Sequence, residues 1–560
     1  MNKVEEFRKC RRFAAVIALA LAALLTPVHA PVLAQQGRPA PQQNAEAPRG
    51  APQGGPAGAA AEQGARPRAQ NDNTALRLPA DSTTEHMVEL PGRTLRFKAT
   101  AGSIPLLDAE SGALQAEIAY VAYVVGDPGS PGSLAASRPL TFLFNGGPGA
   151  ASAYLDIGAV GPWRLPFSNI SASATPALEP NAETWLDFTD LVFIDPVSTG
   201  YSHIVASGDN VRRQFFSVDG DADALAVVIR KWVEKNGRQS SVKFVVGESY
   251  GGFRVPKVAR ALTGRQGVGV RGLIMISPVL DFANFGLRRH MPMSWVTRLP
   301  SMAATVFEAT APFNRDALRE VEAYASGDYL RDLMRGERDA EAIERMTPRV
   351  AAYTGLDAAE VKRLGARIDN GTFQRELNRK RGMVASAYDP TITAYDPSPN
   401  SPTGRFSDPV LDAIGPPITG AMTALYQGPL KWRVDQPYRL LNGDINNQWN
   451  WGRGRAGPEV VDDLRNALAG DRDLYAMVAH GASDLVTPYF GSQLILDQLP
   501  VFGSPERLKL AVYGGGHMFY SRDASRRAFR EDALALYRAA MQQGRPDERA
   551  SAGVGGVGLP

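Results

Sequence analysis

Cysteine is almost absent from this sequence, since its 560 residues contain a single one, Cys10. That residue lies in an N-terminal segment that we expect to be removed, so the rest of the chain has none. This excludes disulfides, a thiol nucleophile and a cysteine metal site from the processed chain. The motifs HExxH, paired CxxC, the Walker loop and the acidic calcium loop are also missing. The sequence therefore predicts no metal and no cofactor.

The chain beyond the N-terminal segment also lacks an excess of charges of one sign. The formal net charge is +3, and residues 1–34 alone carry five Lys or Arg residues against two Glu residues. The remainder of the chain is therefore neutral overall and offers no strongly basic surface. We expect no nucleic-acid partner.

The N-terminal apolar run, residues 13–25, is well short of the ~20 residues that a membrane-spanning helix needs. Basic residues precede this run up to Arg12, and the small residues Val32 and Ala34 follow it. We interpret residues 1–34 as a signal peptide that is cleaved after Ala34. This predicts an exported protein, periplasmic or secreted, without stable membrane insertion after cleavage. An uncleaved anchor is the alternative.

Large apolar residues are almost missing from residues 35–75, which are rich in Gln, Pro, Gly and Ala. Such a stretch buries too little surface to offset the entropy lost on ordering, so we place a disordered linker over residues 35–80. A flexible tail is expected over residues 546–560. The predicted order between them is a first core part, a helical insertion and a second core part, at residues 81–285, 286–435 and 436–545.

Six short apolar runs recur along these core parts. They lie within residues 139–149, 190–200, 241–252, 269–279, 474–484 and 508–517. Near-continuous Val, Ile, Leu and Phe is typical of strands buried on both faces, as in a parallel sheet. Helical patterns such as residues 221–234 and 526–540 lie between or after them. The alternation predicts a three-layer α/β domain with a mostly parallel sheet.

The interval 286–435 departs from this alternation because it is charged and mostly helical. Thr347-Pro348 predicts the start of a helix that ends at Gly355, and a capping box at Asp357 predicts another that ends at Gly371. We interpret the interval as a helical cap over the ligand crevice at the carboxyl ends of the strands. The alternative is a separate helical domain with no part in the site.

The strongest motif is G-x-S-x-G at residues 247–251, in which Ser249 is the central serine. An apolar run precedes it and a helical pattern follows over residues 252–262. This strand–turn–helix context is that of a nucleophile elbow, whose sharp turn exposes the serine hydroxyl at the strand end. A tight turn with a capping serine is the alternative.

A serine hydroxyl needs a base to take its proton. His480 and His517 lie at the ends of the last two apolar runs after Ser249 and can supply that base, whereas His203 and His290 lie in the wrong places for the chain order serine, acid, histidine. We favour His517, which follows the last apolar run through three glycines, and leave a buried structural role as the alternative for His480. Asp484 follows the preceding run and is placed to orient the imidazole.

The tetrahedral intermediate of acyl transfer requires backbone N–H donors aimed at its oxygen. One donor is expected from Tyr250, directly after the nucleophile. The other is expected from the glycine-rich segment NGGPG, residues 145–149, which follows the first apolar run.

Together these segments resemble the serine carboxypeptidase family, of which the chain is identified as a bacterial-type member without the family's disulfides. The similar stretches are FNGGPGAAS (144–152), FIDPVSTGYS (193–202), VGESYGG (246–252), HGASDLVTP (480–488) and GGGHM (514–518). The resemblance implies an α/β-hydrolase fold and a peptide substrate that is cleaved at its C-terminus. It also implies site residues: Ser249, Asp484 and His517 as the catalytic triad, Gly147 and Tyr250 as oxyanion donors, and Asn145, Gly146 and Glu248 on the substrate carboxylate.

The sequence departs from that family at one position, where Ala159 stands in place of a second glutamic acid. Asp156, one helical step away, is a candidate substitute. Glu248 can bind an anion only when it is protonated, because two carboxylates repel each other. An esterase or acyltransferase with the same triad is one alternative function, and a catalytically silent envelope binding protein is another. Oligomeric state and side-chain preference are left open.

Overall fold

The computed structural model describes residues 77–126, 138–167, 170–283, 289–401, 404–452 and 457–542. The predicted signal peptide and the predicted tail lie outside the described residues, as does most of the predicted linker. That linker extends to residue 80 in the prediction, whereas residues 77–80 already pack on the domain. Leu78 is buried and its N–H donates to Glu117 Oε2 at 2.8 Å. The linker therefore ends earlier than predicted.

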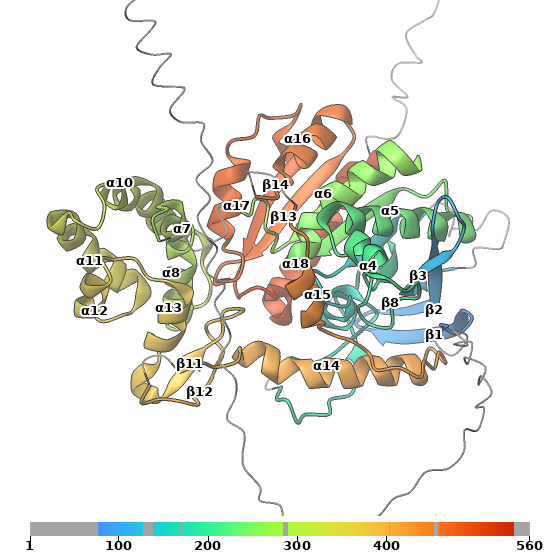
Figure 1. The fold of residues 1–560 in the computed structure, drawn as a ribbon, viewed down its shortest axis with the longest axis horizontal. Helices are drawn as coiled ribbons and strands as arrows, with labels where there is room; N and C mark the ends of the chain where they lie inside the picture. Colours follow the sequence, from blue (N-terminus) through green and yellow to red (C-terminus); the bar gives the residue numbers. More distant parts are fainter. Residues whose placement is uncertain are drawn as a thin grey trace, which may run out of the picture. The chain divides into compact units, whose positions relative to one another are not determined.

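A ten-stranded mixed sheet forms the centre of the described chain (Figure 1). Its strands follow the order β1-β2-β3-β7-β4-β9-β10-β13-β14, and β8 pairs with β3. The strands from β7 to β14 in this order run parallel, and each lies in one of the six predicted apolar runs. The predicted fold class, α/β with a mostly parallel sheet, is confirmed. The bounds are β4 Leu140–Phe144, β7 Asp190–Ile194, β9 Lys243–Glu248, β10 Gly272–Ile276, β13 Tyr475–Gly481 and β14 Leu508–Tyr513.

Three antiparallel strands that the sequence analysis did not predict extend one edge of the sheet. They are β1 (Ser82–Leu90), β2 (Arg93–Leu107) and β3 (Leu114–Val124), and the short β8 (His203–Ile204) pairs with β3. Exposed and partly buried residues alternate along most of β1. Such a strand lacks the continuous apolar run on which the prediction depended.

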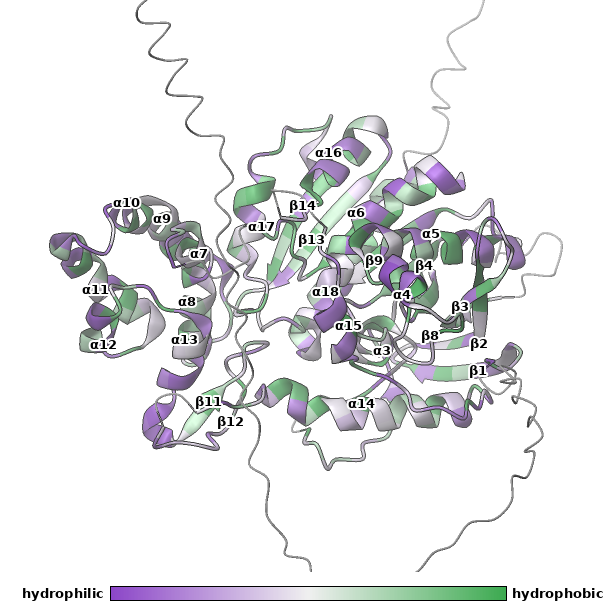
Figure 2. Ribbon diagram, viewed as in Figure 1, coloured by the Kyte–Doolittle hydropathy of each residue, from purple (hydrophilic) through white to green (hydrophobic). Residues whose placement is uncertain are grey.

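Helices cover both faces of the parallel strands, because successive strand residues point to opposite faces. Phe142 of β4 packs in a cluster with α5 (Val218–Lys235) and α6 (Tyr250–Ala261). Its neighbour Leu143 packs in a second cluster with α14 (Pro409–Gln427) and α18 (Asp523–Gln542). Figure 2 shows apolar strands inside and helices that carry hydrophilic residues outside. The burial of both faces explains why these strands consist of nearly continuous apolar residues.

The chain between β10 and β13 is mostly helical, and α8 packs with α17 (Tyr489–Leu496) in a third apolar cluster. Figure 1 shows α14 as a long helix separate from α8 to α13. The elements of this interval are α7 Met293–Val296, α8 Leu299–Glu308, α9 Arg319–Tyr324, α10 Leu330–Met334, α11 Ala340–Thr354, α12 Ala358–Arg363, α13 Asn370–Glu376, β11 Met383–Ala385, β12 Thr393–Tyr395, α14, α15 Gly443–Gln448 and α16 Val461–Gly470. The short elements elsewhere are α3 Ala153–Leu155, α4 Asp209–Phe215, β5 Trp163–Arg164 and β6 Glu179–Pro180.

Two of the predicted helix boundaries in this interval are wrong. The helix α11 begins at Ala340, where the Asp339 carboxylate accepts from the Ala342 N–H at 2.9 Å, so Thr347-Pro348 lies inside it. Its end at Gly355, in the left-handed region with φ +68°, is as predicted. The helix α12 follows its cap at Asp357 as predicted but ends at Arg363. Gly371 instead lies within α13.

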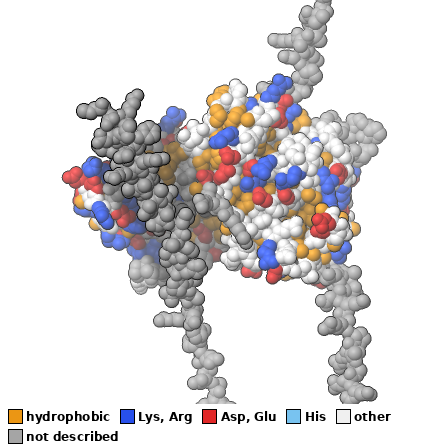
Figure 3. Space-filling view, turned by 45° about the horizontal axis from the view of Figure 1, so that its top comes forward, with side chains coloured by type: hydrophobic (Ala, Val, Ile, Leu, Met, Phe, Trp, Pro, Cys, Tyr) orange, Lys and Arg blue, Asp and Glu red, His pale blue; other side chains and the backbone are white. Residues whose placement is uncertain are grey.

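None of the helices in the described residues combines the length and the apolar composition that a bilayer crossing requires. On the face drawn in Figure 3, Lys and Arg side chains are interspersed with Asp and Glu side chains. The expectation that nucleic acid is not a partner stays a prediction.

Candidate active site

Ser249 lies at the tight turn between β9 and α6. Its φ of +60° is in the left-handed region, which non-glycine residues seldom occupy, and its N–H donates to Ile276 C=O at 2.8 Å. A Cβ at Gly247 would collide with the Gly251 carbonyl, so the turn requires glycine there. This strained turn with small flanking residues is the geometry of a nucleophile elbow.

Asp484 and His517 follow β13 and β14, two neighbouring strands whose carboxyl ends lie at the same edge of the sheet as that of β9. Asp484 Oδ2 is 2.7 Å from His517 Nδ1, and both side chains are buried. Ser249 and His517 line one cavity of about 140 Å³. A carboxylate at Nδ1 holds the ring proton there, which leaves Nε2 to accept the serine proton. The structure thus brings the three predicted triad residues together.

The charges of Asp484 and His517 stabilise each other inside the protein. Burial alone would lower the pKa of His517, but the Asp484 carboxylate outweighs burial and raises it above the ordinary value. Burial likewise opposes ionisation of Asp484, but His517 and the donors from Thr487 hold its pKa below the ordinary value. Asp484 is therefore a carboxylate that favours a protonated His517, as general-base catalysis requires.

His480 occupies a different environment from His517. It is fully buried, its Nε2 lies 2.9 Å from Ser492 Oγ, and burial lowers its pKa to about 4. It is not among the described residues that line the cavity of Ser249. These contacts favour the structural role that the sequence analysis left open for it.

Thr487 is a neighbour of the triad that the sequence analysis did not identify. Its Oγ1 lies 2.6 Å from Asp484 Oδ2, 2.9 Å from Ser277 C=O and 3.1 Å from His517 Nδ1. Its backbone N–H also donates to Asp484 Oδ1 at 2.9 Å. The residue lies within the stretch HGASDLVTP, but only the loop that returns past Asp484 reveals the contact.

We expect Thr487→Val to lower kcat about tenfold, the usual scale for one hydrogen bond to a charged group. Valine keeps the shape of threonine but loses the hydroxyl beside Asp484. Thr487→Ser keeps the hydroxyl and is expected to retain most of the rate. Steady-state kinetics on an ester substrate, with melting temperatures of both variants, measure the effect. Equal losses in the two variants would contradict a role for the hydroxyl.

The segment 145–149 lies directly against the elbow. A Cβ at Gly146 would lie 2.5 Å from the Tyr250 nitrogen and 2.6 Å from the Gly251 nitrogen. Gly147 has a φ of +102° and lines the cavity together with Ser249 and Tyr250. Gly147 and Tyr250 therefore line one cavity with Ser249, which is where the predicted oxyanion donors must lie.

A buried ion pair behind this segment fixes its backbone. Arg254 donates from Nη1 to the Asn145 carbonyl, and its Nε is 2.5 Å from Asp221 Oδ2. Both charged side chains are buried. Arg254 lies one turn into α6, beyond the elbow motif, so the motif alone gave no sign of it.

Glu248 is a buried acid with an unusual set of partners. Its Oε2 accepts from Asn145 Nδ2 at 2.8 Å and from Tyr520 OH at 2.7 Å. Because two donors already face Oε2, a proton bound by the neutral acid belongs on Oε1. Burial raises the pKa of Glu248, although His517 and the two donors oppose the shift. Asn145, Gly146 and Glu248 all line the cavity of Ser249.

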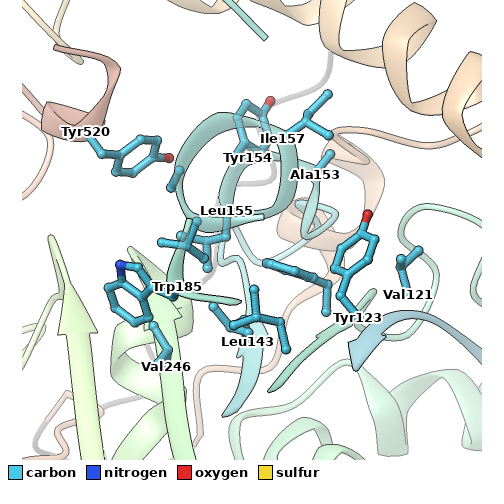
Figure 4. Packing of buried hydrophobic residues seen from close by; sticks show 14 of the residues in the cluster. Val121, Tyr123, Leu143, Ala153, Tyr154, Leu155, Ile157, Trp185, Val246 and Tyr520 are labelled. Atoms are coloured by element: carbon cyan, nitrogen blue, oxygen red, sulfur yellow. The ribbon is translucent and has the colours of Figure 1, made fainter. Parts of the chain in front are cut away.

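Neither Ala159 nor Asp156 is among the described residues that line this cavity. Asp156 is buried, its Oδ2 accepts from Tyr123 OH at 3.2 Å, and burial raises its pKa. Asp156 therefore does not replace the missing second acid at the site, contrary to the suggestion from the sequence. Figure 4 shows Tyr154 and Ile157 at the α3 turn, with Tyr123 and Tyr520 on opposite sides of it in this view.

The interval 286–435 contributes side chains to the site. Tyr388 and Leu411 line the cavity of Ser249, and the Tyr388 ring stands edge-on to His517 with centroids 5.2 Å apart. Tyr388 and Met518 also line a second cavity of about 650 Å³, whose wall includes Ile414. These contacts favour the predicted cap over a separate helical domain with no part in the site.

Comparison with known proteins gives partial matches to serine carboxypeptidases. The family model described as serine carboxypeptidase matches residues 132–297. Pheromone-processing carboxypeptidase KEX1 of Phaeosphaeria nodorum is 31% identical over 133 residues, which are 23% of this chain and 19% of that protein. The protein of the same name from Metarhizium robertsii is 33% identical over 137 residues, 23% of this chain and 20% of that protein. The matches thus span about a fifth of these relatives' length.

One solved structure extends the likeness to most of the fold. The crystal structure of Kex1(delta)p, a prohormone-processing carboxypeptidase from Saccharomyces cerevisiae, superposes with a TM-score of 0.52 at 16% identity. The superposition covers 79% of this chain and 91% of that one, and at this identity it shows the fold alone. Residues 132–297 are thus similar to serine carboxypeptidases, and the described chain has an α/β-hydrolase fold.

Proposed function

We propose that this protein is a serine-type carboxypeptidase that releases C-terminal residues from peptides through an acyl-enzyme intermediate. The observation that carries the proposal is the Asp484–His517 pair, 2.7 Å apart, whose imidazole lines the same cavity as Ser249. The family match covers the nucleophile and the oxyanion segment but not Asp484 or His517. The geometry of those two residues therefore supports the proposal independently of that match.

In the proposed mechanism Ser249 Oγ attacks the carbonyl carbon of the scissile peptide bond while His517 Nε2 takes its proton. The N–H groups of Gly147 and Tyr250 stabilise the oxyanion of the tetrahedral intermediate. His517 then returns the proton to the leaving amine, and the C–N bond breaks to leave an ester on Ser249. Water, deprotonated by the same histidine, hydrolyses this ester and restores the serine.

Glu248 gives this site its preference for the end of a peptide. Protonated on Oε1, it donates a hydrogen bond to the terminal carboxylate, whereas the ionised acid repels that carboxylate. Its pKa is raised by burial, so the neutral form persists to higher pH than for an exposed glutamate. Binding of a free C-terminus is therefore expected to weaken as pH rises through the pKa of Glu248.

We expect Glu248→Gln to remove that pH dependence of KM for peptides with a free carboxylate. The glutamine amide donates at every pH, so KM should stay flat where the wild-type KM rises. The charge of Glu248 also contributes to the raised pKa of His517. The acidic limb of kcat/KM on a neutral ester should therefore move to lower pH in the variant. Unchanged pH profiles on both substrates would contradict the assignment of Glu248.

An esterase or acyltransferase with the same triad is the second candidate function, favoured by Ala159 in place of a second acid. Rates on a blocked dipeptide with a free carboxylate and on its amide discriminate the two functions. A carboxypeptidase prefers the free acid, whereas equal rates indicate that the carboxylate is not recognised. A catalytically silent binding protein is the third hypothesis, and labelling with a fluorophosphonate tests it. If the protein is silent, the probe leaves Ser249 unmodified.

The proposal is tested by mass spectrometry of the products from a mixed peptide pool, with Ser249→Ala as the blank. Loss of single C-terminal residues is the expected result, and internal cleavage or no cleavage overturns the proposal. We also propose that the protein acts outside the cytoplasm, in the periplasm or as a secreted protein. This localisation is supported by the sequence of residues 1–34, and a mature N-terminus at Gln35 in the exported protein would test it.

A further inference from the structure

Two of the three tyrosines that line the cavity have no role in the mechanism above. Tyr154, from α3, and Tyr388, from the segment between β11 and β12, both line the cavity of Ser249 and Glu248. Their side chains come from distant parts of the sequence. Tyr154 precedes Ala159 by five positions, on the same turn that would otherwise present the second acid.

The hydroxyls of Tyr154 and Tyr388 have no hydrogen-bond partner among the described residues. Buried tyrosines normally satisfy their hydroxyl, because an unpaired polar group is costly away from water. Tyr123, Tyr329 and Tyr520 of the same chain do so, donating to Asp156, to the Ala366 carbonyl and to Glu248. Tyr154 and Tyr388 both line the cavity, so these hydroxyls are available to a ligand bound there.

The cavity has a shortage of donors for an anion. No Lys or Arg is among the described residues that line it, and one of the two N–H donors of the Asn145 side-chain amide is already bound to Glu248. A substrate carboxylate that enters must therefore be held by neutral donors. Glu248 is such a donor only while it is protonated, and no second acid stands beside it.

A tyrosine is suited to that task at any working pH. Burial raises the pKa of Tyr154, and the neighbouring Tyr388 and Glu248 raise it further. Burial also raises the pKa of Tyr388, with smaller contributions from nearby carboxylates that include Glu248. Both hydroxyls therefore keep their proton and can donate it in a hydrogen bond, whereas a second acid would lose its proton as pH rises.

We propose that the hydroxyls of Tyr154 and Tyr388 donate hydrogen bonds to the C-terminal carboxylate of a peptide substrate and so replace the missing second acid. This assignment rests on the proposed carboxypeptidase function and names the specificity-determining residues of that site. It makes Tyr154 and Tyr388 substrate-binding residues, whose effect depends on whether the substrate carries a free carboxylate.

The test compares Tyr154→Phe, Tyr388→Phe and the double variant on two substrates, a blocked dipeptide acid and its amide. Each single change removes one oxygen and keeps the ring. We expect KM for the acid to rise about tenfold in each single variant, the scale of one hydrogen bond to a charged acceptor, with kcat and the constants for the amide unchanged. Tyr353→Phe is the matched control, because it removes a hydroxyl whose bond to Glu320 is exposed to solvent. It should leave the constants for both substrates unchanged.

Fluorophosphonate labelling of Ser249 and melting temperatures establish that each variant keeps its active site. Tyr388→Phe tests the proposal on its own where Tyr154→Phe fails to fold. Equal losses on acid and amide, or no loss on either, overturn the assignment while the wild-type enzyme still prefers the acid. If the wild-type enzyme itself treats acid and amide alike, the proposed carboxypeptidase function fails and the tyrosine assignment fails with it.

Discussion

Ser249→Ala is expected to lower kcat/KM for peptide hydrolysis more than about 10³-fold while the protein stays folded. Alanine removes the only oxygen that can form the acyl-enzyme, so the Asp484–His517 pair has no hydroxyl to deprotonate. The oxyanion donors and the binding cavity survive in the variant, and they account for the residual rate over water. Steady-state kinetics on a peptide acid, together with active-site labelling of the wild-type enzyme, measure the loss.

The matched control for this change is Ser173→Ala, at an exposed serine whose hydroxyl has Ser171 as its one hydrogen-bond partner among the described residues. It should keep full activity and the same melting temperature. Turnover by Ser249→Ala at the wild-type rate would remove the acyl-enzyme mechanism. A matching loss in Ser173→Ala would instead indicate that the preparation, rather than the nucleophile, limits the rate.

The parallel strands could be predicted from sequence because their burial leaves a direct mark on composition. In β4, Phe142 and Leu143 pack into clusters on opposite faces of the sheet, so neither face tolerates polar residues. The edge strand β1 buries few of its residues, of which Val88 is one. Its mixture of polar and apolar residues is also typical of a loop. A method that looks for continuous apolar runs finds the centre of such a sheet and misses its half-exposed edge.

Helix boundaries failed where two local signals compete. Thr347-Pro348 is a sound start signal by itself, yet Asp339 caps an earlier start of α11, and Pro348 lies inside the helix. Glycine at position 371 is a residue type typical of a helix end. Yet Asp369 caps a new helix there, because its side chain accepts from the Thr372 N–H at 2.8 Å. Tertiary packing decides between such signals, and a single sequence does not contain it.

The site residues also fall into those that could be predicted from sequence and those that could not. Ser249, Asp484 and His517 were predicted because each follows a strand of one parallel sheet, whose carboxyl ends must lie at one edge. Thr487 and Tyr520 reach the triad and Glu248 through loops and turns whose course no periodicity specifies. The resemblance to a family supplied the role of Glu248 but not the two donors that select which of its oxygens holds the proton.

Gly146→Ala is the change with the second largest expected effect, about 10²–10³-fold in kcat, the scale of losing one oxyanion donor. The new Cβ would lie 2.5 Å from the Tyr250 nitrogen, 2.6 Å from the Gly251 nitrogen and 2.7 Å from the Glu248 carbonyl oxygen. All three are backbone atoms, so no side-chain rotation relieves the contact. The segment 145–149 must move away from the elbow, which separates Gly147 from Tyr250.

Gly420→Ala is the control, because a Cβ at that helical position of α14 has no neighbour within 4 Å. Alanine there should leave kcat unchanged and raise stability slightly, by up to about 1 kcal/mol, since it favours the helix. Kinetics on an ester without a free carboxylate separate loss of the oxyanion site from loss of carboxylate binding. A Gly146→Ala enzyme with wild-type kcat on that ester would mean that Gly147 and Tyr250 need not lie together, and the proposed oxyanion site would have to be abandoned.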